Sequence, residues 1–141
     1  MTKIAKIYLL LGIFQALHSM EEMYSRLYEF FWVATGFFHG FIPFLPQFRM
    51  SPDLFALLNM GIILIILASV PFLNAGHLWA RSLAWLFAIL EIINGLAHIG
   101  GVIIFSRYVP GAVTAPFLFL LGLVLARRLL KDKPKKAKIF F

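Results

Sequence analysis

The 141-residue sequence contains no cysteine. This excludes disulfide bonds, thiolate metal sites and thiol nucleophiles. Charged residues make up only 13 % of the chain, and 62 % of it is hydrophobic, with a mean hydropathy of +0.91. Soluble domains are about half apolar. The length allows one domain, and a soluble core of that size does not hide 16 Phe and 3 Trp. The composition therefore indicates a lipid bilayer as the solvent.

Acidic residues are scarce, with 6 Asp and Glu against 13 Lys and Arg, giving a formal net charge of +7. More than half of the basic residues follow the last apolar run, namely Arg127, Arg128, Lys131, Lys133, Lys135, Lys136 and Lys138. Basic flanks of this kind mark the cytoplasmic side of a membrane helix and attract anionic lipid headgroups. The charge thus indicates membrane topology and not nucleic-acid binding. We predict one transmembrane domain over residues 1–130 and a basic cytoplasmic tail over residues 131–141.

Four apolar runs predict an all-α fold, an integral membrane bundle of four transmembrane helices. The first run, Ile7 to Met20, resembles a signal peptide but leads directly into two glutamates without a cleavage site, so we expect a retained helix reaching about Tyr28. The other predicted spans are Leu54–Leu73, Leu78–Phe105 and Val113–Leu130. Each run approaches or exceeds the roughly 20 residues that a bilayer requires.

Residues 30–44 are apolar and aromatic but short, so we predict a re-entrant or interfacial segment between the first two spans. Four spans place both termini on one side of the membrane. Lys3, Lys6, Arg81 and the basic tail then share the cytoplasm, as the positive-inside rule requires. A fifth span would separate the tail from Lys3 and Lys6. We expect the protein in a bacterial inner (plasma) membrane with both termini cytoplasmic.

Two stretches place ionisable residues inside predicted spans. On a helix, His18 lies one turn before Glu21 and Glu22, at spacings of three and four residues. Glu91, Asn94 and His98 recur at i, i+3 and i+7, which is one helix face. At 1.5 Å per residue, the first group lies roughly 21 to 27 Å and the second roughly 16 to 27 Å from the cytoplasmic side. We therefore expect the first and third spans to pair face to face and form one site.

An ionised carboxylate at such depth costs several kcal/mol unless it is paired or solvated. One solution is a divalent metal, zinc, iron or manganese, held by His18, Glu22, Glu91 and His98. Helix bundles bind metals through inward Glu and His side chains of facing helices. The alternative is a metal-free site in which a carboxyl is protonated or a histidine is charged. The predicted catalytic residues are His18, Glu21, Glu22, Glu91, Asn94 and His98.

Weaker candidates lie outside these two stretches. His39 belongs to the segment that would fold back over the site, and His77 lies in a cytoplasmic turn. Arg107 and Tyr108 are expected to anchor the outer end of the third span at the interface, and an alternative for Arg107 is to pair with a site carboxylate or an anionic headgroup. Pro110 and the glycine after it predict a turn, with Thr114 capping the last helix.

The stretch LHSMEEM resembles the signature of the HXXEE family of small membrane proteins. The later stretch NGLAHIGGVIIFSRYVPGAVTAP resembles the second block of that family, and the likeness extends from about Leu9 to Leu121. The resemblance implies an integral membrane protein and no settled activity.

The leading hypothesis is a membrane-embedded enzyme that acts on a lipid-like, isoprenoid-like or sterol-like substrate, either with a metal or by His–Glu proton transfer. The alternatives are a protein that binds or transports a lipid, an ion or protons, and an accessory subunit whose polar network only fixes packing. Membrane lipids, a small hydrophobic ligand and a second copy of the chain are the expected partners; nucleic acid is not. A blind cavity open sideways to lipid favours the enzyme, and a water-filled passage favours transport.

Overall fold

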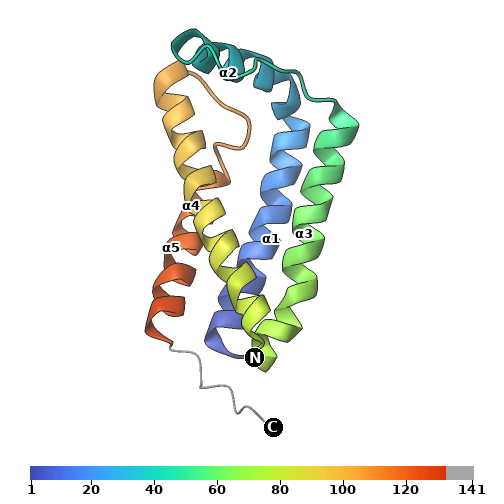
Figure 1. The fold of residues 1–141 in the computed structure, drawn as a ribbon, viewed down its shortest axis with the longest axis vertical. Helices are drawn as coiled ribbons and strands as arrows, with labels where there is room; N and C mark the ends of the chain where they lie inside the picture. Colours follow the sequence, from blue (N-terminus) through green and yellow to red (C-terminus); the bar gives the residue numbers. More distant parts are fainter. Residues whose placement is uncertain (133–141) are drawn as a thin grey trace.

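The computed structural model describes residues 1–132, and within them the chain forms five α-helices and no strand. The helices are α1 (Lys3–Tyr24), α2 (Leu27–Phe41), α3 (Pro52–Ala75), α4 (Leu78–Phe105) and α5 (Ala115–Lys131). The all-α prediction is confirmed. Figure 1 shows α1, α3, α4 and α5 running lengthwise, with α2 lying across one end. Most of the predicted basic tail, residues 133–141, lies outside the described residues.

Two of the lengthwise helices, α3 and α4, are long and apolar enough to cross a membrane. Helix α5 has only 17 residues, and α1 includes Lys3, Lys6, Glu21 and Glu22. Within residues 1–132, two helices therefore meet the requirement by length and composition, and not the four that we expected. Residues 30–44 do not run alongside these helices, because most of them belong to the crosswise helix α2.

The predicted helix boundaries agree with the structure for α4 and differ for α1. Helix α1 ends at Tyr24, because Arg26 adopts a left-handed conformation with φ 57° and ψ 48°. This conformation turns the chain from α1 into the crosswise helix α2. The expectation that the first helix continues to about Tyr28 is wrong for this reason.

The hydrophobic core fills the half of the molecule that is distant from α2. It contains Tyr8, Leu11, Ile66, Phe87 and Leu125, which come from all four lengthwise helices. Helix α1 packs along α3 and α5, and α4 also packs along α3 and α5. The first and third predicted spans, α1 and α4, are thus diagonal neighbours that face each other across the interior, whereas we expected them to pair directly.

Two glycines allow α4 and α5 to approach closely. A Cβ atom on Gly95 would lie 2.6 Å from the Phe119 Cβ and 3.0 Å from the Ala115 carbonyl oxygen. A Cβ atom on Gly122 would lie 2.8 Å from the carbonyl oxygen of Ala88. Backbone atoms cannot move aside as a flexible side chain does, so these contacts require glycine.

Replacing Gly95 with Ala is therefore expected to destabilise the fold by about 1 to 3 kcal/mol, the usual cost of overpacking. Gly100→Ala is the matched control, because it lies in the same helix with open space around its Cβ position. Alanine has a higher helix propensity than glycine, so this control should leave the stability unchanged or raise it by up to about 1 kcal/mol. Thermal unfolding followed by circular dichroism measures both. Equal melting temperatures for the two variants would contradict the close α4–α5 packing.

Candidate functional site

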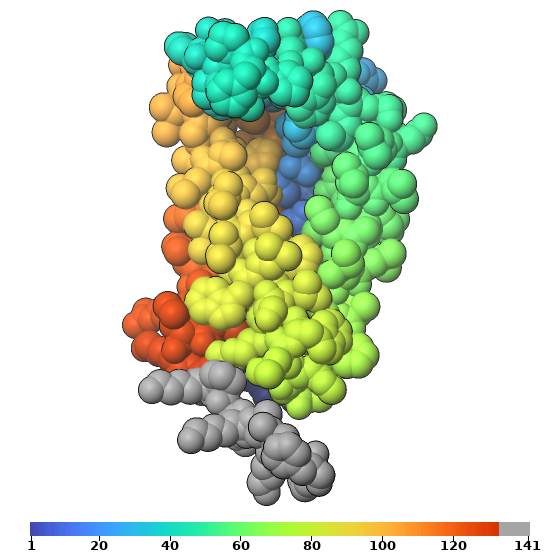
Figure 2. Space-filling view, in the orientation of Figure 1, coloured from blue at the N-terminus to red at the C-terminus, as the bar shows by residue number. Residues whose placement is uncertain are grey.

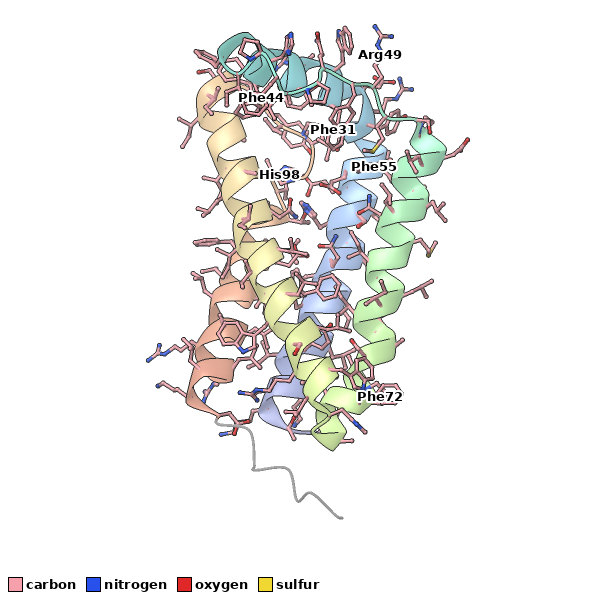
Figure 3. All side chains as sticks on the ribbon, in the orientation of Figure 1. Phe31, Phe44, Arg49, Phe55, Phe72 and His98 are labelled. Carbon is pink, nitrogen blue, oxygen red and sulfur yellow. The ribbon has the colours of Figure 1, made fainter. Side chains whose placement is uncertain are left out.

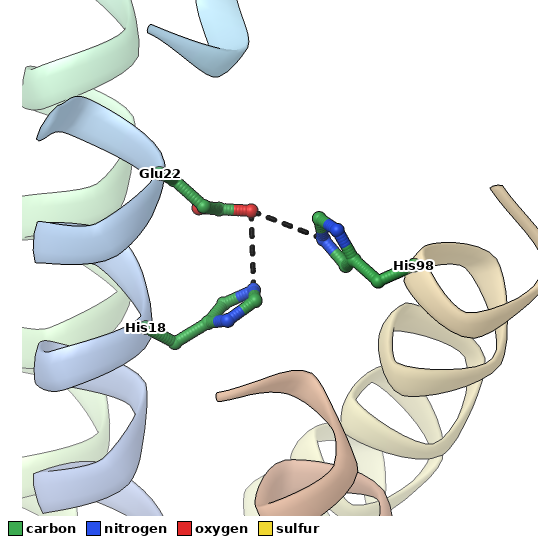
Figure 4. Close-up of side chains that lie close together, drawn as sticks. All are labelled: His18, Glu22 and His98. Atoms are coloured by element: carbon green, nitrogen blue, oxygen red, sulfur yellow. Dashed lines mark ion pairs between the residues drawn. The ribbon is translucent and has the colours of Figure 1, made fainter. Parts of the chain in front are cut away.

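Three buried side chains meet beneath α2, two from α1 and one from α4 (Figure 4). The Glu22 Oε1 atom lies 3.1 Å from the His18 Nε2 and 3.2 Å from the His98 Nε2. The two imidazole rings are 4.9 Å apart and nearly perpendicular. His18 is fully buried, and Glu22 and His98 are each 6 % exposed. One carboxylate oxygen is therefore shared by two histidines that are 80 residues apart in the chain.

These three residues form a group that could hold a metal ion. One ligand atom from each lies within 4.8 Å of the other two. The group contains three of the four metal ligands predicted from the sequence. The fourth, Glu91, is buried nearby but binds amide groups instead.

Glu91 is 4 % exposed and is surrounded by hydrogen-bond donors. The Asn94 Nδ2 donates to its Oε2 over 3.3 Å. With its amide nitrogen turned toward the carboxylate, Gln15 donates to both Glu91 oxygens over 3.1 Å. Two amide groups therefore orient the Glu91 carboxyl group, which is able to exchange a proton.

Asn94 connects Glu91 to the histidine pair. Its Nδ2 lies 3.1 Å from the His18 Nε2 as well as 3.3 Å from the Glu91 Oε2. An amide nitrogen carries two hydrogens and donates both, so each of these contacts fits an acceptor. The predicted residues His18, Glu22, Glu91, Asn94 and His98 are thus brought together in one polar cluster.

Glu21 points to a different place, the segment between α4 and α5. This connection, residues 106–114, descends from the end of α4, so that α5 begins part-way along the molecule (Figure 1). Glu21 accepts four hydrogen bonds from it: Tyr108 Oη at 2.7 Å, Val113 N–H at 3.0 Å, Thr114 N–H at 2.9 Å and Thr114 Oγ1 at 2.6 Å. The carboxylate therefore satisfies backbone groups that have no helical partner. Partial burial, together with the nearby Glu21 carboxylate, raises the pKa of the Tyr108 phenol, which keeps it a donor.

Thr114 precedes α5 at the N-cap position, but its side chain makes no capping hydrogen bond. The predicted capping role is wrong. The hydroxyl instead lies 2.7 Å from the His18 Nδ1 while it donates to Glu21. Glu21 thus contacts the histidine indirectly, through one hydroxyl group.

The predicted turn at Pro110 and Gly111 is present, and Gly111 has a left-handed φ of 91°. A Cβ atom there would lie 2.6 Å from the His98 Cε1 and 2.8 Å from the His18 Cε1. The turn therefore rests its backbone on both imidazole rings, and only glycine combines this φ with this proximity.

Several polar residues of the site were not predicted from the sequence as functional. Ser19 donates to Asn59 of α3 over 2.6 Å, and the Gln15 amide lies 3.2 Å from the same serine hydroxyl. All three are buried. The available signal was the presence of polar residues within apolar runs, Gln15 and Ser19 in the run that forms α1 and Asn59 in the run that forms α3. Tyr108 was expected only as an interfacial anchor.

The weaker candidates lie outside this cluster. The His39 Nδ1 lies 2.6 Å from the carbonyl oxygen of Leu45 in the segment after α2. His77 is exposed between α3 and α4. The Arg107 guanidinium lies over the rings of Phe30 and Phe105, at 5.4 Å and 6.0 Å from their centroids.

A cavity of about 790 Å³ adjoins the polar cluster. Its walls are mostly apolar, and one face of α2 covers it with Leu27, Phe30, Phe31, Ala34 and Phe38. Figure 3 shows Phe31 and Phe55 around the same interior space as His98. The polar residues that reach the cavity are Gln15, Glu22, Asn59, Glu91, Asn94 and His98.

The cavity lies where the surface is hollowed. In Figure 2 the molecule is open between α3 and α4 just beneath α2, and side chains of α1 are visible through the gap. On the inner side, Phe87 lines the cavity and its ring stacks at a tilt on the core residue Tyr8, 6.4 Å between centroids. The cavity is therefore closed toward the core.

Comparison with protein families gives one match, over residues 9–126, to the family described as a protein of unknown function with HXXEE motif. The chain belongs to the HXXEE family. No curated protein and no solved structure matches the chain significantly. In this HXXEE protein the motif residues are His18, Glu21 and Glu22, and the two glutamates have separate partners. Glu22 binds both histidines, whereas Glu21 binds the segment before α5.

Proposed function

We propose that this HXXEE protein is an integral membrane enzyme that acts on a lipid-like substrate through the cluster of His18, Glu22, Glu91, Asn94 and His98. Helices α1, α3, α4 and α5 cross the bilayer, α2 lies at the outer interface, and both termini are cytoplasmic. The membrane is a bacterial inner (plasma) membrane. The observation that carries the proposal is an apolar cavity that is open at the side and ends on buried carboxyl and imidazole groups.

The membrane assignment is supported by the outward-facing side chains. In α3 and α4 only 28 % of the most apolar window is buried, whereas the core helix of a soluble protein is mostly buried. Leu57 of α3 is 69 % exposed, Ile103 of α4 is 72 % exposed and Leu120 of α5 is 57 % exposed. Large exposed apolar side chains on three helices favour a surrounding of lipid or a partner.

The distribution of charge supports the orientation. Lys3, Lys6 and Arg81 lie at the end of the molecule that is distant from α2, and Arg127 and Arg128 lie near it at the end of α5. Arg81 donates to the carbonyl oxygens of Leu129 and Asp132, which ties the α4 start to the α5 end. The excess of basic residues at this end corresponds to the cytoplasmic side.

The cavity supports a substrate with a hydrocarbon chain. Its opening between α3 and α4 faces the bilayer in the proposed orientation, so a lipid reaches the site without leaving the membrane. Aromatic residues of α2 would cover the hydrocarbon chain of the substrate, and the polar cluster would contact the substrate at one end. A mostly apolar pocket with a few convergent polar groups is the usual form of a small-molecule site.

Glu91 is the candidate general acid–base in this arrangement. It lines the cavity, and Gln15 and Asn94 orient its carboxyl group. Glu22 and His98 also reach the cavity, whereas His18 is fully buried behind them. The site therefore offers a proton acceptor, Glu91, and places the polar groups of Glu22 and His98 in the same apolar cavity.

The closed inner end of the cavity favours an enzyme over a transporter. Tyr8, Leu11, Ile66 and Phe87 fill the interior between the site and the cytoplasmic end. A transport pathway requires a polar passage to both sides, so a packed apolar core is the feature that separates the two functions.

Filling the cavity tests the substrate assignment. Ala97 lines the cavity, so Ala97→Trp should reduce photo-crosslinking of a diazirine-labelled acyl lipid at least about fivefold, because the indole ring occupies much of the pocket volume. Ala68→Trp is the matched control, since Ala68 is exposed on α3 and does not line the cavity. Crosslinking by the control should equal that of the unmodified chain. Equal crosslinking in both variants, mapped to residues outside the cavity, would contradict the proposal.

A further inference from the structure

We infer that His18, Glu22 and His98 bind one divalent transition-metal ion, and that Glu21 acts through Thr114 to fix His18 in the tautomer that metal binding requires. The inference deepens the proposed function and concerns the same site. It is testable without any assay of turnover, so the two claims can fail separately.

The tautomer follows from the donors and acceptors around Thr114. A threonine hydroxyl has one hydrogen, and the Thr114 hydroxyl directs it to an acceptor, the Glu21 Oε2 at 2.6 Å. Among the described residues, the other acceptor that this hydrogen could reach is the Gly111 carbonyl, at 3.4 Å. Toward the His18 Nδ1, 2.7 Å away, the hydroxyl oxygen must therefore accept. The proton of a neutral His18 consequently lies on Nδ1, and Nε2 carries the lone pair.

Asn94 leads to the same conclusion from the other side of the ring. Its Nδ2 faces the Glu91 carboxylate and the His18 Nε2 together. The carboxylate accepts one of the two N–H groups, so Nε2 is the acceptor of the other. Two independent contacts thus place an unprotonated nitrogen toward Glu22 and His98.

An unprotonated Nε2 beside a carboxylate oxygen is favourable only with a proton or a metal cation between them, and a divalent cation also accommodates the His98 Nε2. The His18 Nε2 and the Glu22 Oε1 are only 3.1 Å apart, and both are acceptors. The His98 Nε2 approaches the same oxygen at 3.2 Å. Ligands bound to zinc at about 2.0 to 2.2 Å in a tetrahedral site are separated by roughly 3.3 to 3.6 Å. The two separations from Glu22 are therefore slightly shorter than those of a metal site, and all three ligand atoms lie within 4.8 Å of one another.

The donor set identifies the class of metal. Two imidazole nitrogens and one carboxylate oxygen suit zinc with an open fourth position, and they also match the two-histidine, one-carboxylate set of non-haem iron. The cavity reaches Glu22 and His98, so the open positions face the substrate space. Binding displaces the Asn94 amide from the His18 Nε2, while its contact with Glu91 is retained.

The family motif then divides into two roles. His18 and Glu22, one helical turn apart on α1, are ligands. Glu21, the neighbouring residue, turns to the segment before α5 and is a positioning residue that never touches the metal. His98 has no equivalent support, because its Nδ1 is buried without a hydrogen-bond partner among the described residues. Metal-binding histidines usually donate their other N–H to such a partner, as His18 does.

Metal titration tests the ligand set. The full-length chain, purified in detergent and stripped with a chelator, should bind one Zn²⁺, Fe²⁺ or Mn²⁺ per chain, and the tightest of the three identifies the preferred ion. His98→Ala and Glu22→Gln should each weaken binding by more than about 100-fold, which exceeds the usual effect of an outer residue. His77→Ala, an exposed histidine outside the site, should bind as the unmodified chain does. Folded chain that binds none of the three ions, or His98→Ala that binds equally well, would overturn the metal site.

Two variants of Thr114 test the positioning role of Glu21 and Thr114. In the metal-free chain, ¹⁵N NMR of the imidazole nitrogens should place the His18 proton on Nδ1. Thr114→Val removes the acceptor and should mix the tautomers and weaken metal binding about 10- to 100-fold. Thr114→Ser keeps the hydroxyl and should restore both readouts. If Thr114→Val keeps the Nδ1 proton and full affinity, Glu21 and Thr114 only hold the fold, and the positioning claim fails even if the metal is bound.

Discussion

Replacing Glu91 with Gln should lower conversion of the lipid substrate by about 10²- to 10⁴-fold, the range that general acid–base groups contribute. Glutamine has nearly the same shape and still accepts from Asn94 through its amide oxygen, but it cannot take up a proton. Because Glu91 lies beside the proposed ligands and is not one of them, metal content should be unchanged. Rates per folded chain, with metal content and melting temperature measured alongside, test this prediction.

Glu29→Gln is the matched control for that substitution. Glu29 belongs to α2, its side chain is 60 % exposed, and its contact is an ion pair with Arg26 at 3.4 Å. Exposed pairs of this kind are worth about 0 to 1 kcal/mol. The control should retain full conversion and stability. A Glu91→Gln variant that is as active as Glu29→Gln would remove Glu91 from the chemistry and leave it a packing residue.

Gly111→Ala should disrupt the site more than a methyl group added at any other position. Its Cβ would run into both imidazole rings, and its φ of 91° strains any residue with a side chain. We expect a loss of about 2 to 5 kcal/mol of stability from strain and overpacking together, with displacement of His18 and His98. Metal binding and conversion should fall with it. Thermal unfolding and metal titration of the same sample give both quantities.

Gly76→Ala separates backbone strain from overpacking as causes of the lost stability. Gly76 has a similar φ of 87° at the end of α3, but a Cβ there meets nothing within 4 Å. It should show the backbone strain alone, about 1 to 2 kcal/mol, and keep the metal. Should both glycine variants lose equal stability and keep equal affinity, the turn does not rest on the histidines as described.

Much of the fold could be predicted from the sequence because the apolar runs are long. Helix α4 has the predicted boundaries, and the spacing of Glu91, Asn94 and His98 placed them on one face that does line the interior. The overlap in depth between this face and His18 and Glu22 also agrees with their contacts. Helical periodicity and rise alone contain this information.

The rest depended on tertiary contacts that the sequence does not encode locally. The end of α1 is set by the left-handed conformation of Arg26. The sequence has no glycine or asparagine at this position that would have predicted a turn. The return of residues 106–114 toward His18 brings Thr114 to a histidine 96 positions away. We expected Thr114 to cap α5 because it occupies the N-cap position. Its hydroxyl instead contacts Glu21 and His18, and the local sequence does not indicate either contact.

The two adjacent glutamates show the same limit. Both lie one turn after His18, so spacing assigns them equally to the site. In the structure, neighbouring residues on a helix point about 100° apart, and Glu21 reaches the α4–α5 segment while Glu22 reaches His98. Which of them could bind a metal is therefore decided by what lies beside each face.

The most direct test of the proposed enzyme is a comparison of lipids before and after exposure to the protein. Metal-loaded chain, reconstituted in vesicles of extracted bacterial membrane lipids, should deplete one lipid class over time and form a product of different mass, as measured by mass spectrometry. Folded, metal-loaded Glu91→Gln in the same vesicles should leave that class unchanged. Identical lipid profiles for the unmodified chain and the variant would contradict an enzyme acting on membrane lipids.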